Sequence, residues 1–270
     1  MELENRMNEL DTLKKTILEQ FPRLDEDAKF TFSCHPGVSC FNQCCSDVNI
    51  FLTPYDVLRL KNRLGISSQE FLDKYTQLVA DRKQQLPAVQ LRMTETETKH
   101  CNFVNPEKGC TVYEDRPWSC RMYPVGQASP KESEDSKDEK FYFLLNEEVC
   151  KGAEDGKEWT ISGWMKDQGV GEYDEFGEMF KEIAFHDFFE QGRILTAQKV
   201  EMFFLACYNI DRFKDFIKDT TFLSRFEIEE EQHALIMKDD EELLKFAFEW
   251  IKFGLFGEKT MKIKNQDNKK

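Results

Sequence analysis

The hydrophobic positions in the second half of the chain recur at helical spacing. Phenylalanine and leucine return every three or four residues in the segments GVGEYDEFGEMFKEIAFHDFFE, TAQKVEMFFLACYNI and DDEELLKFAFEWIKFGLF. This period is typical of helices that bury one apolar face. The pattern therefore predicts a helical C-terminal region over residues 169–270.

Helix signals also occur in the first half. The first twenty residues carry apolar side chains at helical spacing, which predicts a leading helix in an N-terminal segment, residues 1–28. Farther along, Thr53 can cap a helix, Pro54 suits its first position, and Asp56 lies where the helix dipole favours an acid. The sequence Ser67-x-x-Glu70 is a capping box for a second helix. Two consecutive short helices are therefore expected here.

The segments between these helices alternate in polarity or contain turn residues. Residues 87–94 and 141–145 predict strands, and the segments CNFV and CTVY around NPEKG predict a hairpin that brings Cys101 and Cys110 together. Residues 114–125 and the charged residues 131–140 are expected to be loops. The predicted fold class is α+β. We expect a small metal-organised cysteine-rich module with short helices and a hairpin, residues 29–168, packed against the helical C-terminal half.

Composition limits the class of protein and its partners. The chain has 270 residues, 40% of them hydrophobic and 33% charged, which is typical of a folded globular protein. Its formal net charge of −14 disfavours phosphate backbones and anionic lipid, so we expect neither a nucleic-acid partner nor a membrane partner. The N-terminus mixes acids and bases without an apolar signal region, so a cytoplasmic location is expected.

Cysteine is the most informative residue type in the sequence. Eight of the nine cysteines lie in the first 150 residues, and four of these fall within twelve positions. Thiolates are soft ligands that select zinc, iron or iron–sulfur clusters, and cysteines in a reducing compartment point to metal binding more than to disulfides. The predicted metal ligands are Cys34, Cys40, Cys44, Cys45, Cys101, Cys110, Cys120 and Cys150.

The sequence leaves the grouping of these ligands open. Eight cysteines suit two four-thiolate sites, or one such site with spare thiols nearby. Neighbouring side chains in extended backbone point to opposite faces, so Cys44 and Cys45 are not expected to bind one ion. If so, the Cys44–Cys45 doublet is shared by two metal sites or belongs to a multi-metal cluster. A labile redox disulfide between vicinal cysteines is the alternative.

Arginine and histidine residues near the clustered cysteines could contribute to a metal site or have an ordinary structural role. Arg116 and Arg121 could offset the negative charge of a thiolate site, or they could pair with nearby acids. His35 and His100 each adjoin a cysteine, and either could replace a thiolate ligand. Cys207 lies in an apolar helical segment and is expected to be a buried hydrophobic residue. No catalytic constellation or nucleotide-binding loop is recognisable, so catalytic residues are unknown and enzyme activity stays open.

Two separated blocks of the sequence carry a family resemblance. The pattern FSC-x5-C-x3-CC followed by IFLTPYDVLRL, and then CNFV and GCTVYEDRPWSCRMYP, resembles the YkgJ-type cysteine-cluster (CxxCxxCC) family of zinc- or iron-chelating proteins. The resemblance covers roughly residues 30–170 and implies a cysteine-rich zinc or iron–sulfur module. Here the first intervals between cysteines are five and three residues, whereas the family pattern has two and two, so the ligand loop is longer.

The expected function is therefore metal binding, with zinc or an iron–sulfur cluster as the bound group. The family also includes flagellin lysine N-methylases, so the resemblance implies an iron–sulfur-dependent protein-lysine methyltransferase as an alternative. A thiol redox sensor is a third possibility, suggested by the cysteine doublet. The sequence does not identify a protein partner.

Overall fold

The structure is a computed structural model that describes residues 21–79, 86–128, 140–145, 150–154 and 156–264. The chain divides into two compact units, and each is built from two separate segments. Unit 1 consists of residues 1–44 and 120–170, and unit 2 of residues 45–119 and 171–270. The predicted helix in the first twenty residues and most of the charged segment 131–140 lie outside the described residues.

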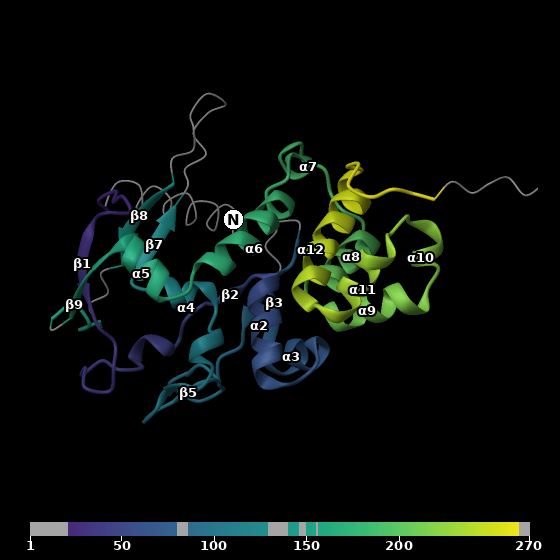
Figure 1. Ribbon diagram of the computed structural model, residues 1–270. Helices are drawn as coiled ribbons and strands as arrows, with labels where there is room; N and C mark the ends of the chain where they lie inside the picture. The colour runs from purple at the N-terminus through teal and green to yellow at the C-terminus, as the bar shows by residue number, and fades with distance from the viewer. Residues whose placement is uncertain (1–20, 80–85, 129–139, 146–149, 155, 265–270) are drawn as a thin grey trace, which may run out of the picture. The chain divides into compact units, whose positions relative to one another are not determined.

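The described part of unit 1 contains short antiparallel ribbons and short helices. Strand β1 pairs with β9, and β7 pairs with β8, as Figure 1 shows. Helix α5 continues directly from β9, and the Thr160 side chain caps it by accepting a hydrogen bond from the Gly163 N–H. The elements of unit 1 are β1 (Lys29–Phe32), η1 (Gln43–Cys45, whose last residue belongs to unit 2), α4 (Trp118–Met122, which begins in unit 2), β7 (Val125–Ala128), β8 (Phe141–Leu144), β9 (Lys157–Thr160) and α5 (Ile161–Asp167).

Unit 2 combines small sheets with a helical layer. The elements from its first segment are β2 (Phe51–Leu52), α2 (Pro54–Leu64), α3 (Ser68–Tyr75), β3 (Thr76–Val79), β4 (Ala88–Leu91), β5 (Val104–Asn105), β6 (Gly109–Cys110) and η2 (Tyr113–Asp115). The elements from its second segment are α6 (Gly171–Ala184), α7 (Asp187–Glu190), α8 (Ala197–Cys207), α9 (Ile210–Asp219), α10 (Phe222–Arg225), α11 (Glu230–Lys238), α12 (Asp240–Ile251) and η3 (Lys252–Phe256).

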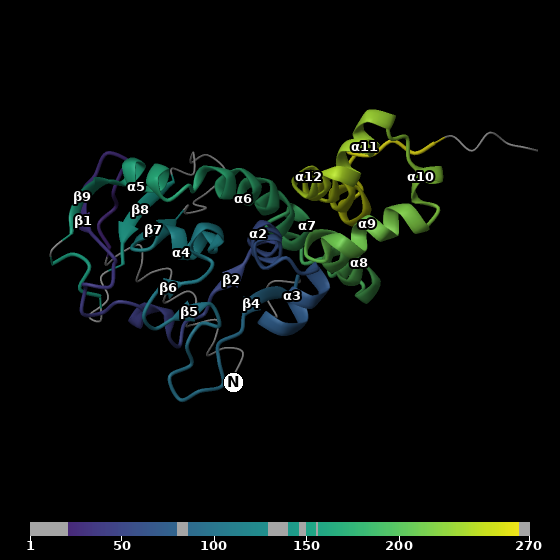
Figure 2. The same ribbon diagram turned by 60° about the horizontal axis from the view of Figure 1, so that its bottom comes forward.

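The helical layer of unit 2 is arranged around α12. This helix packs against α8, α9 and α11 on one side and against α2 and α6 on the other, and both views show these helices side by side (Figures 1 and 2). Strands β2, β4 and β3 form a three-stranded antiparallel sheet in that order. The α+β class and the helical C-terminal region predicted from the sequence are therefore confirmed.

The two units differ in how much apolar surface they bury. The core of unit 2 includes Phe203, Phe213 and Phe248, which are all 0–1% exposed, and a stacked ring contact joins Phe213 to Trp250. Unit 1 buries a much smaller set of residues, which centres on edge-to-face contacts of Trp164 with aromatic side chains of β1. Small folding units commonly need a metal or disulfide in addition to their core.

A buried ion-pair cluster links helices within unit 2. Lys61 on α2 is 5% exposed, and its Nζ lies 3.0 Å from Asp211 Oδ1 and 2.8 Å from Asp240 Oδ2. Burial by itself would raise the pKa of Asp240, but hydrogen bonds from Lys214 and Lys61 outweigh it, so the pKa is lowered. The lysine therefore ties α2 to α9 and α12.

Several local predictions are confirmed, and two need correction. Helix α2 begins after a reciprocal Thr53–Asp56 capping box, and Ser67 caps α3 through the Glu70 N–H. Residues 141–144 form β8, and the strand predicted over 87–94 is shorter, as β4. The hairpin pairs Cys110 with Val104 and not with Cys101, because its turn lies between Asn105 and Gly109 and this register leaves Cys101 before the first strand.

The second correction concerns the segment predicted as a loop around Cys120. It contains the short helix α4, whose first N–H, that of Trp118, donates to Asp56 Oδ1 at 2.8 Å. A carboxylate distant in sequence thus caps this helix, which local sequence signals do not reveal. Among the described residues, no helix is both long and apolar enough to cross a membrane.

The contacts of Asp56 lead to a stability prediction. Asp56 is 1% exposed and accepts hydrogen bonds from the Thr53 N–H, the Thr53 hydroxyl and the Trp118 N–H. Replacing it in Asp56→Ala leaves these donors without their acceptor and should lower the free energy of unfolding by about 2–4 kcal/mol in a denaturant titration. The exposed Asp73→Ala control on α3 should change it by no more than about 0.5 kcal/mol. Equal effects of the two variants would contradict this interpretation.

Candidate metal centre

Four thiols line one small cavity in unit 1. The cavity has a volume of about 20 Å³, and its walls are formed by Phe32, Ser33, Cys34, Cys40, Cys44, Tyr123, Cys150 and Gly152. Phe32 and Tyr123 are in edge-to-face contact with ring centroids 5.9 Å apart, so they form an apolar side of the cavity. Four of the eight cysteines predicted as ligands therefore meet in unit 1.

The pairing of β1 with β9 brings the two ends of this site together. Cys34 follows β1 by two residues, and Cys150 precedes β9. The Ser33 N–H donates to the Gly152 carbonyl at 2.9 Å, and the Lys157 N–H donates to the Ser33 hydroxyl at 3.1 Å. These bonds hold the Cys34 segment against the Cys150 segment although the two are far apart in the sequence.

The thiols in this cavity influence one another electrostatically. Cys34 lies at the exposed edge of the site, yet the protein around its sulfur raises the pKa of this thiol to about 11. Desolvation is the largest cause, and the negative charges that Cys44, Cys40 and Cys150 carry when ionised add to it. A bound cation would reverse this repulsion, because it favours the thiolate form of all four groups.

A backbone donor also points at this site. The Lys151 N–H lies 3.0 Å from Cys40 Sγ. N–H donors to sulfur stabilise the thiolate, which is the form that binds metal. Among the described residues, no three His, Cys, Asp or Glu side chains are already placed around a common ion position. The donor set is suited to a soft cation, and ligation would require the thiols to turn inward by side-chain rotation.

Three other predicted ligands lie in unit 2. The bridge between Ser46 and His100 is antiparallel, and the Cys101 N–H donates to the Cys45 carbonyl at 2.8 Å. This pairing places Cys45 opposite Cys101, where cross-strand Cβ atoms are about 4.5–5.5 Å apart. Cys110 lies on β6, and the Thr111 N–H to Phe103 carbonyl bond of 2.8 Å holds its segment beside that of Cys101.

The cysteine doublet is divided between the units, because the boundary falls between Cys44 and Cys45. The sequence-based prediction assumed extended backbone at this point, whereas the two residues end the 3₁₀ turn η1. Successive side chains in such a turn are about 120° apart, so they still face different directions. Cys44 lines the cavity of unit 1, and Cys45 lies across from Cys101 in unit 2.

The remaining cysteines and histidines occupy other positions. Cys120 lies in α4, and Cys207 is 1% exposed in α8, where burial raises the pKa of its thiol well above the ordinary value. Cys207 is thus a buried core residue, as predicted. His35 Nδ1 accepts a hydrogen bond from the Gly37 N–H, and His100 Nδ1 is 2.5 Å from the Ser46 hydroxyl.

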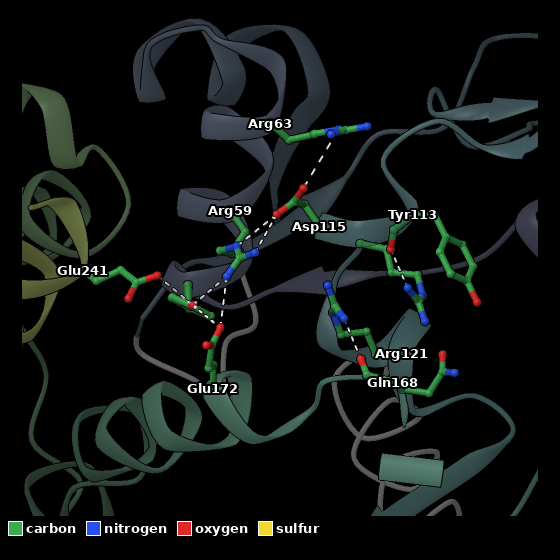
Figure 3. A network of polar contacts seen from close by, with 10 residues as sticks. Arg59, Arg63, Tyr113, Asp115, Arg121, Gln168, Glu172 and Glu241 are labelled. Carbon is green, nitrogen blue, oxygen red and sulfur yellow. Dashed lines mark hydrogen bonds and ion pairs between the residues drawn. The ribbon is translucent and has the colours of Figure 1, made fainter. Parts of the chain in front are cut away.

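An ion-pair network positions the loop that follows Cys110. Figure 3 shows Arg59 of α2 between Asp115 of η2 and Glu172 of α6, with Nη2–Oδ1 and Nη1–Oε2 distances of 2.8 Å and 3.1 Å. The Tyr55 hydroxyl accepts from Arg59 Nη1 and donates to Glu241 Oε1 on α12. The sequence did not reveal this network, because its partners come from four distant elements. It anchors η2 to the helices of unit 2.

Two buried arginines were predicted to offset thiolate charge. Arg121 is 6% exposed, and its Nη1 donates to the Gln168 carbonyl at 2.6 Å, as Figure 3 shows within unit 1. Arg116 is also 6% exposed, and its guanidinium lies over the Tyr113 ring at 3.8 Å and bonds to the Tyr113 carbonyl. Arg116 opposes the rise in the pKa of Cys110 that burial causes, as does the Val112 N–H.

Comparison with known proteins identifies the thiol-bearing part of the chain. Residues 33–151 match the model of the CxxCxxCC family, which is described as a "putative zinc- or iron-chelating domain". The match contains all eight clustered cysteines and confirms the resemblance found in the sequence. No curated protein and no solved structure matches the chain.

Proposed function

Because residues 33–151 match the model of a zinc- or iron-chelating domain, we propose that the cavity of unit 1 binds one zinc ion. The ligands are the thiolates of Cys34, Cys40, Cys44 and Cys150. The observation that carries this proposal is their convergence on one cavity from segments at both ends of the matched domain. Four thiolates are the donor set of closed, structural zinc sites.

The four converging cysteines supply the donor set of a single tetrahedral ion. An iron–sulfur cluster held by the same four thiolates is the alternative, and iron with acid-labile sulfide in the purified protein would identify it. Zinc and ferrous ions both accept thiolates in a tetrahedron, and zinc is the common choice where all four positions are taken by protein.

The ion would have a structural role in unit 1. It would join the loop that follows β1 to the segment that precedes β9, in a unit whose apolar core is small. Four thiolates and a divalent ion leave a net charge of about −2. The Lys151 N–H at Cys40 Sγ offsets part of that charge.

Substitution of the proposed ligands should remove the metal. Cys34→Ser, Cys40→Ser, Cys44→Ser and Cys150→Ser should each lower the zinc content by about one ion per chain, because a three-thiolate remnant binds far more weakly. Mass spectrometry of protein purified without oxygen and desalted measures the content. Cys207→Ala should retain the full amount, because this thiol is buried in α8. Unchanged zinc in all four serine variants would refute the proposed centre.

Removal of the metal should loosen unit 1 selectively. Without the ion, the loops around β1 and β9 lose their connection, whereas α8 and α12 keep the large core of unit 2. Hydrogen exchange with and without a zinc chelator should therefore show faster exchange in β1 and β9 and little change in the cores of α8 and α12. Protection that stays the same in β1 and β9 after complete metal loss would contradict the structural role.

A further inference from the structure

We propose that the outer edge of β2 pairs with the same edge of a second copy of this chain, so that two chains form a symmetric antiparallel dimer. The pairing segment is residues 48–52, with the sequence VNIFL. It lies in unit 2 and contains no cysteine, so the inference goes beyond the proposed function.

The backbone of this segment has hydrogen-bonding groups that its own sheet does not use. β2 is an outer strand, because the strands follow the order β2, β4, β3. The Leu91 N–H donates to the Ile50 carbonyl at 2.8 Å, and Phe51 lies opposite Gln90. Antiparallel strands alternate between bonded and non-bonded pairs, so the N–H and C=O groups of Asn49 and Phe51 point away from β4. Within the described part of the chain, these four groups have no hydrogen-bond partner.

A large apolar side chain is exposed at the same edge. Phe51 is 53% exposed and shares the outer face of the sheet with Gln90 and Gln77, whose side-chain amides are hydrogen-bonded to each other at 2.8 Å. Gln90 Nε2 also donates to Asn49 Oδ1 at 2.6 Å. Phe51 thus lies beside a row of amides and not in an apolar core. A strand added next to β2 would cover its ring.

The β2 edge also lacks the features that usually prevent strands from pairing. Exposed edges are commonly protected by charged side chains, proline or a bulge. Residues 48–52 contain no charged residue, proline or glycine, although 33% of the whole chain is charged. By contrast, the ribbon of β1 and β9 carries the exposed ion pair of Lys29 and Glu158. At the other edge of the same sheet, Arg92 Nη2 already donates to the Thr76 carbonyl of β3 at 2.6 Å.

The open groups of β2 are self-complementary, which favours a second copy as the partner. In an antiparallel pair centred on Ile50, Asn49 of each copy would lie opposite Phe51 of the other, and these two pairs would exchange four backbone hydrogen bonds. The two Ile50 residues would form the closer, non-hydrogen-bonded pair between them. No like charges would lie opposite each other, and the two Phe51 rings would be diagonal neighbours on one face. Such an isologous contact closes as a dimer.

The pairing is expected to be weak and to depend on salt. Its core is two short strands and two phenylalanine rings, so it belongs with small, transient contacts. Each chain has a formal net charge of −14, and the resulting repulsion opposes association. Raising the ionic strength from about 0.01 M to about 0.15 M shortens the Debye length from about 30 Å to about 8 Å and should therefore strengthen the dimer.

Sedimentation of the native chain, purified without oxygen and with its metal retained, tests the pairing. The wild-type chain should dimerise as its concentration rises to about 1 mM. Phe51→Lys places a charge in each half of the contact, and Phe51→Pro removes an N–H that points away from β4 and is not needed within the sheet. Both should lower the association constant by at least about tenfold, because each substitution occurs twice in the dimer. Phe51→Tyr should retain the dimer, and circular dichroism checks that each variant is folded.

Leu78→Lys is the matched control, because Leu78 is 57% exposed on β3, at the opposite edge of the same sheet. It should leave the association constant unchanged. Hydrogen exchange should show protection of the Asn49 and Phe51 amides only at concentrations at which the wild-type chain dimerises. Three results would each overturn the proposal: a chain that stays monomeric up to about 1 mM at an ionic strength of about 0.15 M, a dimer that persists in folded Phe51→Lys and Phe51→Pro, or a dimer that Leu78→Lys abolishes.

Discussion

Four cysteines that line one small cavity set the chemistry of unit 1. Without a cation, ionisation of these thiols is unfavourable. Burial and the repulsion between their thiolates raise the pKa of Cys34 to about 11. With a soft cation the same closeness becomes favourable, since each thiolate gains a ligand bond and the positive charge cancels the repulsion. Cys44 and Cys150 are about 100 residues apart, so linking them through an ion would close a long loop of the unfolded chain.

The two units differ in the interactions that can stabilise them. Unit 2 has an extensive helical core and a buried Lys61 that bonds to two aspartates, so its helices can be held by packing and ion pairs. Unit 1 has paired ribbons around Trp164 and Phe32, with much less apolar burial. The small unit is therefore where a bound ion would change stability most. The thiols of unit 2 lie instead at the edge of a well-packed region, next to the anchored turn that carries Arg116.

The sequence was most informative where structure is local. The Thr53–Asp56 capping box, the helical periodicity of α8 and α12 and the burial of Cys207 all follow from short-range patterns. The side chains of neighbouring cysteines diverge in most backbone conformations, so the sequence could suggest that Cys44 and Cys45 belong to different groups. The partners within each group could not be read, because they depend on contacts such as β1 with β9 and Ser46 with His100. Likewise, α4 was missed because its first N–H bonds to Asp56, which is distant in sequence.

X-ray absorption at the edge of the bound metal tests the central claim most directly. The native chain, purified without oxygen, should show a first coordination shell made mostly of sulfur, at about 2.3 Å if the metal is zinc. A first shell of nitrogen and oxygen at about 2.0–2.1 Å would contradict thiolate ligation. A fully folded native protein that contains no metal would contradict it as well.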